Sequence, residues 1–343
     1  MHIGCHVTIL NMQKKVRISP RYYKRGFGPY IRLCDHLGGF DSQGRNWILD
    51  EIQVKAQARG IKPMVMYHQM LPQWVLDNYP YLDIRFDSLW QWDLTFRALK
   101  TDKEFPKPDF NNFLVTMLGS AHQGRMLLCS ALARMNWLDF NYTKKNFAFT
   151  IDQLDGAIQE IAPPDLEPQY HKLLVNYEWA NIFSTNQHGS LTFAKRRIPW
   201  LDKLDRLIPN FTQSFVHVVS ETLPTSYVPF VTEKFLHSIV TQGLFVAYAQ
   251  PGWHECINKQ YGFMLYQKIF NYSFDNNKDP IGRLLEIIDM LLPYSRLSKQ
   301  DWHDLYLLEK PAIEFNYHHY LSEDYHRHME GFDQDWTIEG CIS

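Results

Sequence analysis

The chain has 343 residues, a formal net charge of −2, and 45% apolar and 15% aromatic residues. This length suggests about two domains, and the apolar content excludes an intrinsically disordered chain. The apolar runs are shorter than the roughly 20 residues that a membrane span needs, so we expect no integral membrane association. No basic leader precedes the first apolar run, so we expect no secretory signal peptide.

Cysteine and histidine usage indicates neither a disulfide framework nor a metal centre. The five cysteines are odd in number and scattered along the chain, which is typical of reduced thiols. The histidines of the C-terminal segment, His318, His319, His326 and His328, fit no tight ligand spacing. We therefore expect a protein without a metal site, in the reducing environment of the cytoplasm.

Positive charge is concentrated near the N-terminus. Residues 1–110 contain 16 Lys+Arg against 11 Asp+Glu, a balance of +5, whereas the remainder has 19 against 26, a balance of −7. The segment Lys14–Arg32 holds seven cations, no acid and four interleaved aromatic rings. It is either a solvated loop with inward rings or a polyanion-binding segment, in which cations meet phosphates and rings stack. On the second interpretation the contacts to the polyanion would be Lys14, Lys15, Arg17, Arg21, Tyr22, Tyr23, Lys24 and Arg25, with a further cluster of Lys195, Arg196 and Arg197.

In the first third of the chain, the pattern predicts a strand over 6–10, a helix over 52–60 that ends at Gly60, and a strand over 62–69. The aromatic-rich stretch 71–93 fits either helix or strand. Residues 100–112 are charged and contain two prolines, so they are the best candidate for an interdomain linker.

The rest of the chain alternates strands and helices. We expect strands over 113–120, 146–151, 216–223 and 244–249, and helices over 124–135, 232–243, 251–262 and 279–295. A helical insertion is expected over 163–210. This alternation is typical of a doubly wound, mostly parallel sheet.

Two cations lie where helix electrostatics disfavours them. Arg125 and Lys234 each lie just inside a predicted helix, where the partial positive charge of the helix N-terminus costs roughly 0.3–1 kcal/mol. Two such placements indicate an anion between them, because phosphates bind outside the carboxyl ends of the strands in α/β sheets. Glu221 ends a strand, and Thr232 can cap the helix that carries Glu233 and Lys234. The alternative is an ordinary capped surface helix. The chain has no glycine-rich dinucleotide motif and no phosphate-binding P-loop motif.

These residues resemble a known family. Ser220–Gly262 looks like the donor-binding motif of α-1,3-fucosyltransferases and their viral and bacterial glycosyltransferase-like relatives: a strand ending in Glu, a Thr-Glu-Lys helix start, then a Gly followed by an apolar strand. Residues 118–136 resemble the family's Ser…Arg segment, and 313–321 its closing strand. The resemblance covers roughly residues 113–320. Pro229, the bulky loop 250–254 and the insertion depart from the family pattern.

The resemblance implies two Rossmann-like domains facing a cleft, the GT-B architecture of glycosyltransferases. The acceptor domain would span 1–108, the nucleotide-sugar domain 109–318 with its insertion at 163–210, and a tail over 319–343 would cross back to the first domain. The donor would be a UDP-, GDP- or ADP-sugar, with no metal strictly required. Its contacts would be Ser120, Arg125, Glu221, Thr232, Glu233, Lys234 and Gly252.

The catalytic base should come from the first domain, because an inverting transfer needs a group that takes the acceptor proton. His68, at the end of a predicted strand, is the first candidate and Asp35 the second, and either could instead be a structural residue. We favour DNA with a hydroxymethylated base as the acceptor, as in phage-type DNA modification in a bacterial or virus-infected host cell. A glycan or lipid-linked saccharide is the alternative, and a non-catalytic nucleic-acid-binding protein on a glycosyltransferase frame is the second. The oligomeric state stays open.

Overall fold

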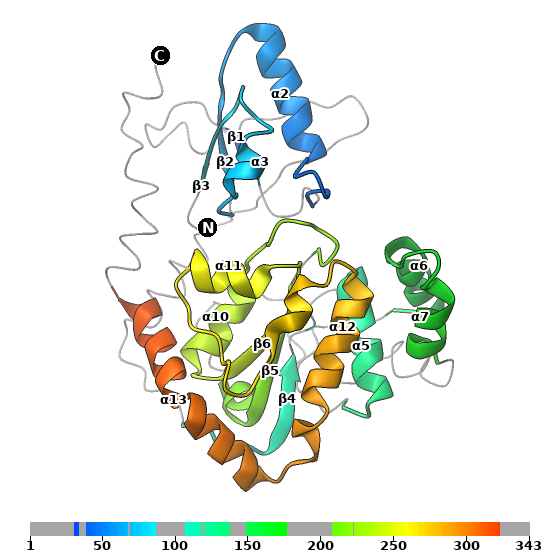
Figure 1. Cartoon of the computed structure of the whole chain (residues 1–343), viewed down its shortest axis with the longest axis vertical. Helices are drawn as coiled ribbons and strands as arrows, with labels where there is room; N and C mark the ends of the chain where they lie inside the picture. Colours follow the sequence, from blue (N-terminus) through cyan, green and yellow to red (C-terminus); the bar gives the residue numbers. More distant parts are fainter. Residues whose placement is uncertain are drawn as a thin grey trace, which may run out of the picture. The chain divides into compact units, whose positions relative to one another are not determined.

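The computed structural model describes residues 31–33, 39–67, 69–86, 107–116, 118, 121–137, 149–176, 208–221 and 223–322. The chain divides into two compact units, one of residues 1–90, 226–228 and 323–343, the other of residues 91–225 and 229–322. Each unit contains a small three-stranded parallel sheet together with helices (Figure 1). The protein is therefore mixed α/β, as the alternation of the sequence predicts.

The first unit carries a parallel sheet with the strand order β1-β2-β3. Its elements in chain order are β1 (Ile31–Leu33), α2 (Trp47–Arg59), β2 (Met64–Tyr67), α3 (Gln73–Leu76) and β3 (Asp83–Phe86). The predicted helix before Gly60 and the predicted strand over 62–69 are both confirmed. The ambiguous stretch 71–93 forms α3 and β3 where the structure describes it.

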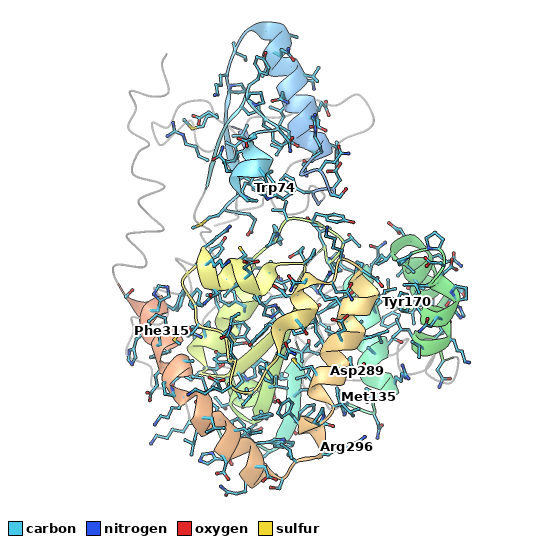
Figure 2. The ribbon with its side chains drawn as sticks, viewed as in Figure 1. Trp74, Met135, Tyr170, Asp289, Arg296 and Phe315 are labelled. Carbon is cyan, nitrogen blue, oxygen red and sulfur yellow. The ribbon has the colours of Figure 1, made fainter. Side chains whose placement is uncertain are left out.

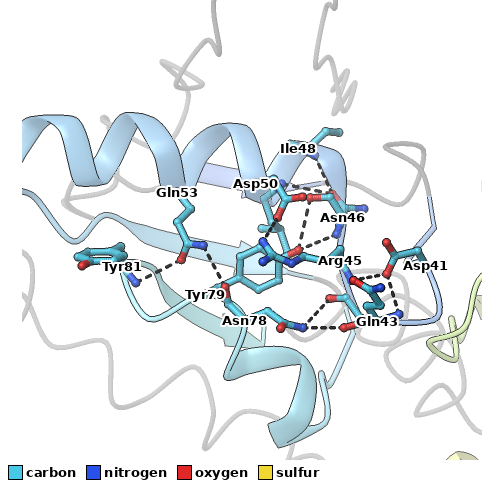
Figure 3. A network of polar contacts seen from close by, with 12 residues as sticks. Asp41, Gln43, Arg45, Asn46, Ile48, Asp50, Gln53, Asn78, Tyr79 and Tyr81 are labelled. Carbon is cyan, nitrogen blue, oxygen red and sulfur yellow. Dashed lines mark hydrogen bonds and ion pairs between the residues drawn. The ribbon is translucent and has the colours of Figure 1, made fainter.

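Local chemistry sets both ends of α2. The Asn46 side chain accepts hydrogen bonds from the N–H groups of Ile48 and Leu49, at 3.0 and 3.3 Å, which satisfies donors that a helix N-terminus leaves open. Gly60 ends the helix at φ 62°, a left-handed conformation that glycine adopts without steric cost. Asn46 also donates its backbone N–H to the hydroxyl of Tyr79 at 2.6 Å (Figure 3). Burial raises the pKa of that phenol, so it stays neutral.

A short segment from later in the chain completes the core of the first unit. The hydroxyl of Ser226 accepts the N–H of Phe40 at 3.0 Å, and the carbonyl of Phe40 accepts the N–H of Tyr227 at 2.9 Å. Val228 is 2% exposed and packs in the same apolar cluster as Phe40. Residues 226–228 therefore belong to the first unit, although the residues on either side of them belong to the second.

The second unit is built on the parallel strands β4 (Asn112–Thr116), β5 (Ser214–Ser220) and β6 (Leu244–Tyr248), in that order. Every residue of β5 and β6 is buried, as expected for a parallel sheet covered by helices on both faces. The strand predictions over 113–120, 216–223 and 244–249 are confirmed for these elements.

Helices cover both faces of this sheet (Figure 1). On one face lie α5 (Gln123–Arg134) and α12 (Pro280–Leu291), which contact each other. On the other face lie α10 (Glu233–Val240) and α13 (Lys299–Leu321). The remaining elements are α6 (Ile151–Ile161), α7 (Glu167–Leu174), α11 (Trp253–Lys259), and the short 3-10 helices η2 (Tyr272–Asn276) and η3 (Tyr294–Arg296). Among the described residues, no helix is both long enough and apolar enough to cross a membrane.

Two expected strands are wrong. Thr150 lies within the predicted strand 146–151, but it caps α6 in a reciprocal pair with Gln153, and this capping box begins a helix. Residues 313–321 form the end of α13 rather than a closing strand. The buried residues of that helix recur at helical spacing, Tyr306, Glu309, Ile313, Asn316 and Tyr320. The expected strand 6–10, linker residues 100–106, residues 177–207 of the insertion and the tail after 322 lie outside the described residues.

A buried histidine lies within β5. The Nε2–H of His217 donates to the carbonyl of Phe211 at 2.8 Å. Burial lowers the pKa of His217 from 6.5 to about 4, because a charged ring would lose its hydration. Gly243 lies against this ring so closely that an added Cβ would be 1.9 Å from Cε1 of His217. Only glycine fits at that position without movement of the sheet.

We expect Gly243→Ala to destabilise the protein by about 1–3 kcal/mol, because the added methyl would overpack the sheet. Gly156 is the matched control, since a Cβ there meets no atom within 4 Å. Gly156→Ala in helix α6 should stabilise by about 0.5–1 kcal/mol. Urea unfolding of both variants measures the difference, and equal free energies of unfolding would contradict the packing account.

His217 should also make stability depend on pH. Between pH 6.5 and about 4, His217 binds a proton in the unfolded chain but stays neutral in the folded protein. The contribution of the neutral ring to the free energy of unfolding is therefore complete above pH 6.5 and is lost as the pH falls toward 4. His217→Gln can still donate a hydrogen bond to Phe211. As the pH falls, the free energy of unfolding of this variant should decrease by up to about 1.4 kcal/mol less per pH unit than that of the wild type. Urea unfolding at several pH values tests this, and parallel slopes would refute it.

Candidate functional site

The structure describes only part of the site that the sequence predicts. It includes Arg125, Glu221, Thr232, Lys234 and Gly252 with their side chains, and the backbone of Glu233. The two predicted base candidates, all of the predicted acceptor contacts and the predicted donor contact Ser120 lie outside the described residues: Lys14, Lys15, Arg17, Arg21, Tyr22, Tyr23, Lys24, Arg25, Asp35, His68, Ser120, Lys195, Arg196 and Arg197.

Helices α5 and α10 both begin beyond the carboxyl ends of strands. The chain passes from β4 into α5 and from β5 into α10, so both helix N-termini belong to the same edge of the sheet. Arg125 lies in the first turn of α5 and is 6% exposed. His122 at the N-cap position makes no side-chain capping hydrogen bond, and the first turn of α5 contains no acid. The positive end of the helix dipole therefore coincides with a buried cation.

Gly124 allows the start of α5 to lie tightly against the neighbouring loop and strand. A Cβ at this position would be 2.6 Å from Cγ of Pro224 and 3.4 Å from Cε1 of Tyr248. Pro224 follows β5 and Tyr248 ends β6. The N-terminus of α5 is therefore packed directly against the carboxyl edge of the sheet.

At the start of α10, three predicted residues come together. Both carboxylate oxygens of Glu221 accept from Thr232, one from its N–H at 3.0 Å and the other from its hydroxyl at 2.6 Å. The hydroxyl of Thr232 in turn accepts from Nζ of Lys234 at 2.9 Å and from its N–H at 3.4 Å. Glu221 is 1% and Thr232 is 3% exposed. The predicted N-cap role of Thr232 is confirmed, whereas the carboxylate of Glu221 points into the protein.

Arg283 of α12 binds the loops at this edge. Its guanidinium donates to the carbonyls of Ala249 at 2.8 Å, Pro224 at 2.6 Å, and Asn277. These carbonyls follow β6, β5 and η2 respectively. Burial lowers the pKa of Arg283, but an arginine keeps its charge in proteins. One buried side chain therefore holds three loops in place. No motif in the sequence indicated this role of Arg283.

Three buried hydroxyls lie on the face of the sheet that α5 and α12 cover. Ser220 and Tyr248 are paired neighbours at the ends of β5 and β6, and Thr116 ends β4. Within the described part of the chain, these hydroxyls have no hydrogen-bond partner. Burial raises the pKa of Tyr248, so the phenol is neutral. Unsatisfied buried hydroxyls are costly, and water or a ligand would satisfy them. A Tyr at the end of an apolar strand was the only signal for this in the sequence.

Gly252 and the two residues after it form the start of α11. Gly252 has φ 75°, and its N–H donates to the carbonyl of Asp275 at 2.8 Å. The indole N–H of Trp253 donates to the carbonyl of Phe230 at 3.1 Å. His254 accepts the N–H of Ala247 at 3.0 Å and pairs with Asp275 at 2.8 Å. Trp253 and His254 are therefore core residues that anchor the loop after β6.

No family model matches this chain, and neither the characterised proteins nor the solved structures contain a protein similar enough to match it.

We expect Arg283→Met to destabilise the second unit by at least about 3 kcal/mol, since each buried carbonyl left without a donor costs about 1–3 kcal/mol. Arg296 is the control, an exposed arginine in η3 (Figure 2). Arg296→Met should stay within about 0.5 kcal/mol of the wild type. The free energy of unfolding in urea is the measurement, and a similar small effect for both variants would contradict the anchoring role.

Proposed function

We propose that this chain is a nucleotide-sugar-dependent glycosyltransferase with the GT-B architecture of two Rossmann-like domains. The observation that carries the proposal is the carboxyl edge of the β4-β5-β6 sheet. Two helices begin there, and each has a cation in its first turn, Arg125 in α5 and Lys234 in α10. Helix N-termini and cations together favour a bound phosphate group. A nucleoside diphosphate attached to a sugar is the substrate that best fits this edge in a doubly wound sheet.

In the proposed reaction the acceptor oxygen attacks the anomeric carbon of the sugar and forms the new C–O bond. The bond from that carbon to the diphosphate oxygen breaks, and the nucleoside diphosphate leaves with the bonding electrons. Arg125 and Lys234 would neutralise the charge that develops on this leaving group. A base from the first unit, His68 or Asp35, would take the acceptor proton. The resemblance implies that Glu233 and Glu221 hold the ribose or sugar. The geometry of Glu221 favours a supporting role.

Two acceptors remain as candidates. The proposal of DNA with a hydroxymethylated base depends on the basic segment Lys14–Arg32 and the cluster at 195–197. A neutral saccharide is favoured by the surface of the described first unit, which exposes Trp47 by 46% and Trp74 by 47%. Its residues 39–86 carry five Lys+Arg and five Asp+Glu. Exposed indole rings offer flat apolar faces for stacking, and this balance of charge gives no attraction to a polyanion.

The test is nucleoside-diphosphate release from UDP-, GDP- and ADP-sugars, with and without duplex DNA that contains 5-hydroxymethylcytosine. Arg125→Ala should lower turnover at least about a hundredfold, because a positioned cation at the leaving group acts in the transition state. Arg134 is an exposed residue in the last turn of the same helix, and Arg134→Ala should change turnover by less than about twofold. Circular dichroism and urea unfolding are the controls that test whether both variants fold.

Release that requires the modified duplex, and that weakens steeply with salt, would identify DNA as the acceptor. Nucleoside-diphosphate release at the same rate with and without DNA would favour a saccharide as the acceptor. Equal turnover by the wild type and Arg125→Ala would refute the proposed site. No release from any of the donors would favour a nucleic-acid-binding protein without transferase activity.

A further inference from the structure

Glu221, Thr232 and Lys234 form a continuous chain of hydrogen bonds at the start of α10. The chain runs from Nζ of Lys234 to the hydroxyl of Thr232 at 2.9 Å, and from that hydroxyl to the carboxylate of Glu221 at 2.6 Å. Its inner end is buried, since Glu221 and Thr232 are 1% and 3% exposed, whereas Lys234 is only partly buried. The three residues therefore connect a buried carboxylate to a cation that reaches the surface.

The direction of each hydrogen bond follows from the chemistry of the groups. An ionised carboxylate only accepts and an ammonium group only donates. The single proton of the Thr232 hydroxyl must therefore point to Glu221, and its lone pairs are left for Lys234. Glu221 also accepts the N–H of Thr232 at 3.0 Å, so both of its oxygens are engaged. The carboxylate thus orients the hydroxyl, and the hydroxyl orients the ammonium group.

This arrangement goes beyond an ordinary helix cap. A cap requires only that the hydroxyl of Thr232 accept the backbone N–H of Lys234, which it does at 3.4 Å. The bond to Nζ is shorter, and it holds a flexible cation close to a helix N-terminus, where the dipole disfavours it. A lysine side chain loses considerable conformational freedom when it is fixed in this way. An anion bound at the same edge would compensate both costs.

We propose that Glu221 and Thr232 are positioning residues, which hold the ammonium group of Lys234 ready for the diphosphate of the nucleotide sugar and do not themselves contact the sugar donor. This inference rests on the proposed function. It changes the roles that the family resemblance implies for Glu221 and Thr232. Because the carboxylate is buried behind Thr232, Glu221 acts on the diphosphate through two hydrogen bonds rather than by contact.

A double-mutant cycle on pyrophosphate affinity tests the proposal, because it isolates the coupling between two residues. Thr232→Val replaces the hydroxyl, which also caps α10, with a methyl group, and it should weaken binding of inorganic pyrophosphate about tenfold. In a Lys234→Met background the same change should alter affinity by less than about twofold.

Thr232→Ser keeps a hydroxyl at this position and should bind pyrophosphate within about twofold of the wild type. Glu221→Gln keeps an acceptor for the N–H of Thr232 but removes the charge, and should weaken binding in the Lys234 background only.

Thr241→Val is the matched control for loss of a buried hydroxyl. Thr241 follows the same helix at its other end, is 2% exposed, and donates its hydroxyl proton to the carbonyl of His237 at 2.6 Å. This variant should lose stability in urea without losing pyrophosphate affinity. Isothermal calorimetry at fixed salt provides the affinities, and unfolding curves show that each variant is folded where binding is measured.

Equal effects of Thr232→Val in both backgrounds, or a wild type that binds no pyrophosphate, would overturn the proposal. The outcome for glycosyl transfer is separate. Coupling without turnover of any nucleotide sugar would retain the positioning role for an anion and remove the transferase. Turnover without coupling would retain the transferase and remove the positioning role.

Discussion

The burial of strands β5 and β6 on both faces is the constraint on which the rest of the second unit depends. Every residue of these strands is buried. Their polar side chains must therefore form hydrogen bonds within the protein or lie at an end of the sheet. Parallel strands bring all carboxyl ends to one edge, together with the N-termini of the helices that follow. The cations Arg125 and Lys234, each in the first turn of its helix, lie near the same edge for this reason.

The loops at the edge are held by interior contacts rather than by their own sequence. Arg283 donates to carbonyls in three of them, and His254 and Trp253 bind the loop after β6 to Asp275 and Phe230. Gly124 lets α5 approach Pro224 and Tyr248. Buried polar groups of this kind are costly when they are unpaired, so together they restrict the loops to a narrow range of positions. A rigid edge is what a preorganised anion site requires.

The two cations at the edge differ in how they are supported. Arg125 is almost fully buried on α5, whereas Lys234 is only partly buried and is oriented by Thr232 and Glu221. Arginine has a rigid planar fork, and lysine is a point charge on a flexible stem. A flexible cation needs a partner that limits its motion if it is to meet a phosphate reliably. The hydrogen-bond chain through Thr232 limits the motion of Lys234, and the proposed transferase reaction would use both cations.

The sequence by itself determined strands β4, β5 and β6, helices α2, α5, α10, α11 and α12, and the local chemistry at several helix ends. Capping by Thr232, the helix end at Gly60, and the cations in the first turns of α5 and α10 depend only on residues that are close together in the chain. Where the prediction failed, at Thr150 and at 313–321, a capping box and helical spacing outweighed the propensity for strand. Only the tertiary structure decided that Glu221 faces inward, that Arg283 binds a carbonyl 59 positions away, and that His217 requires Gly243. These contacts join segments far apart in the sequence, and their energies arise from burial, which no local pattern of residues encodes.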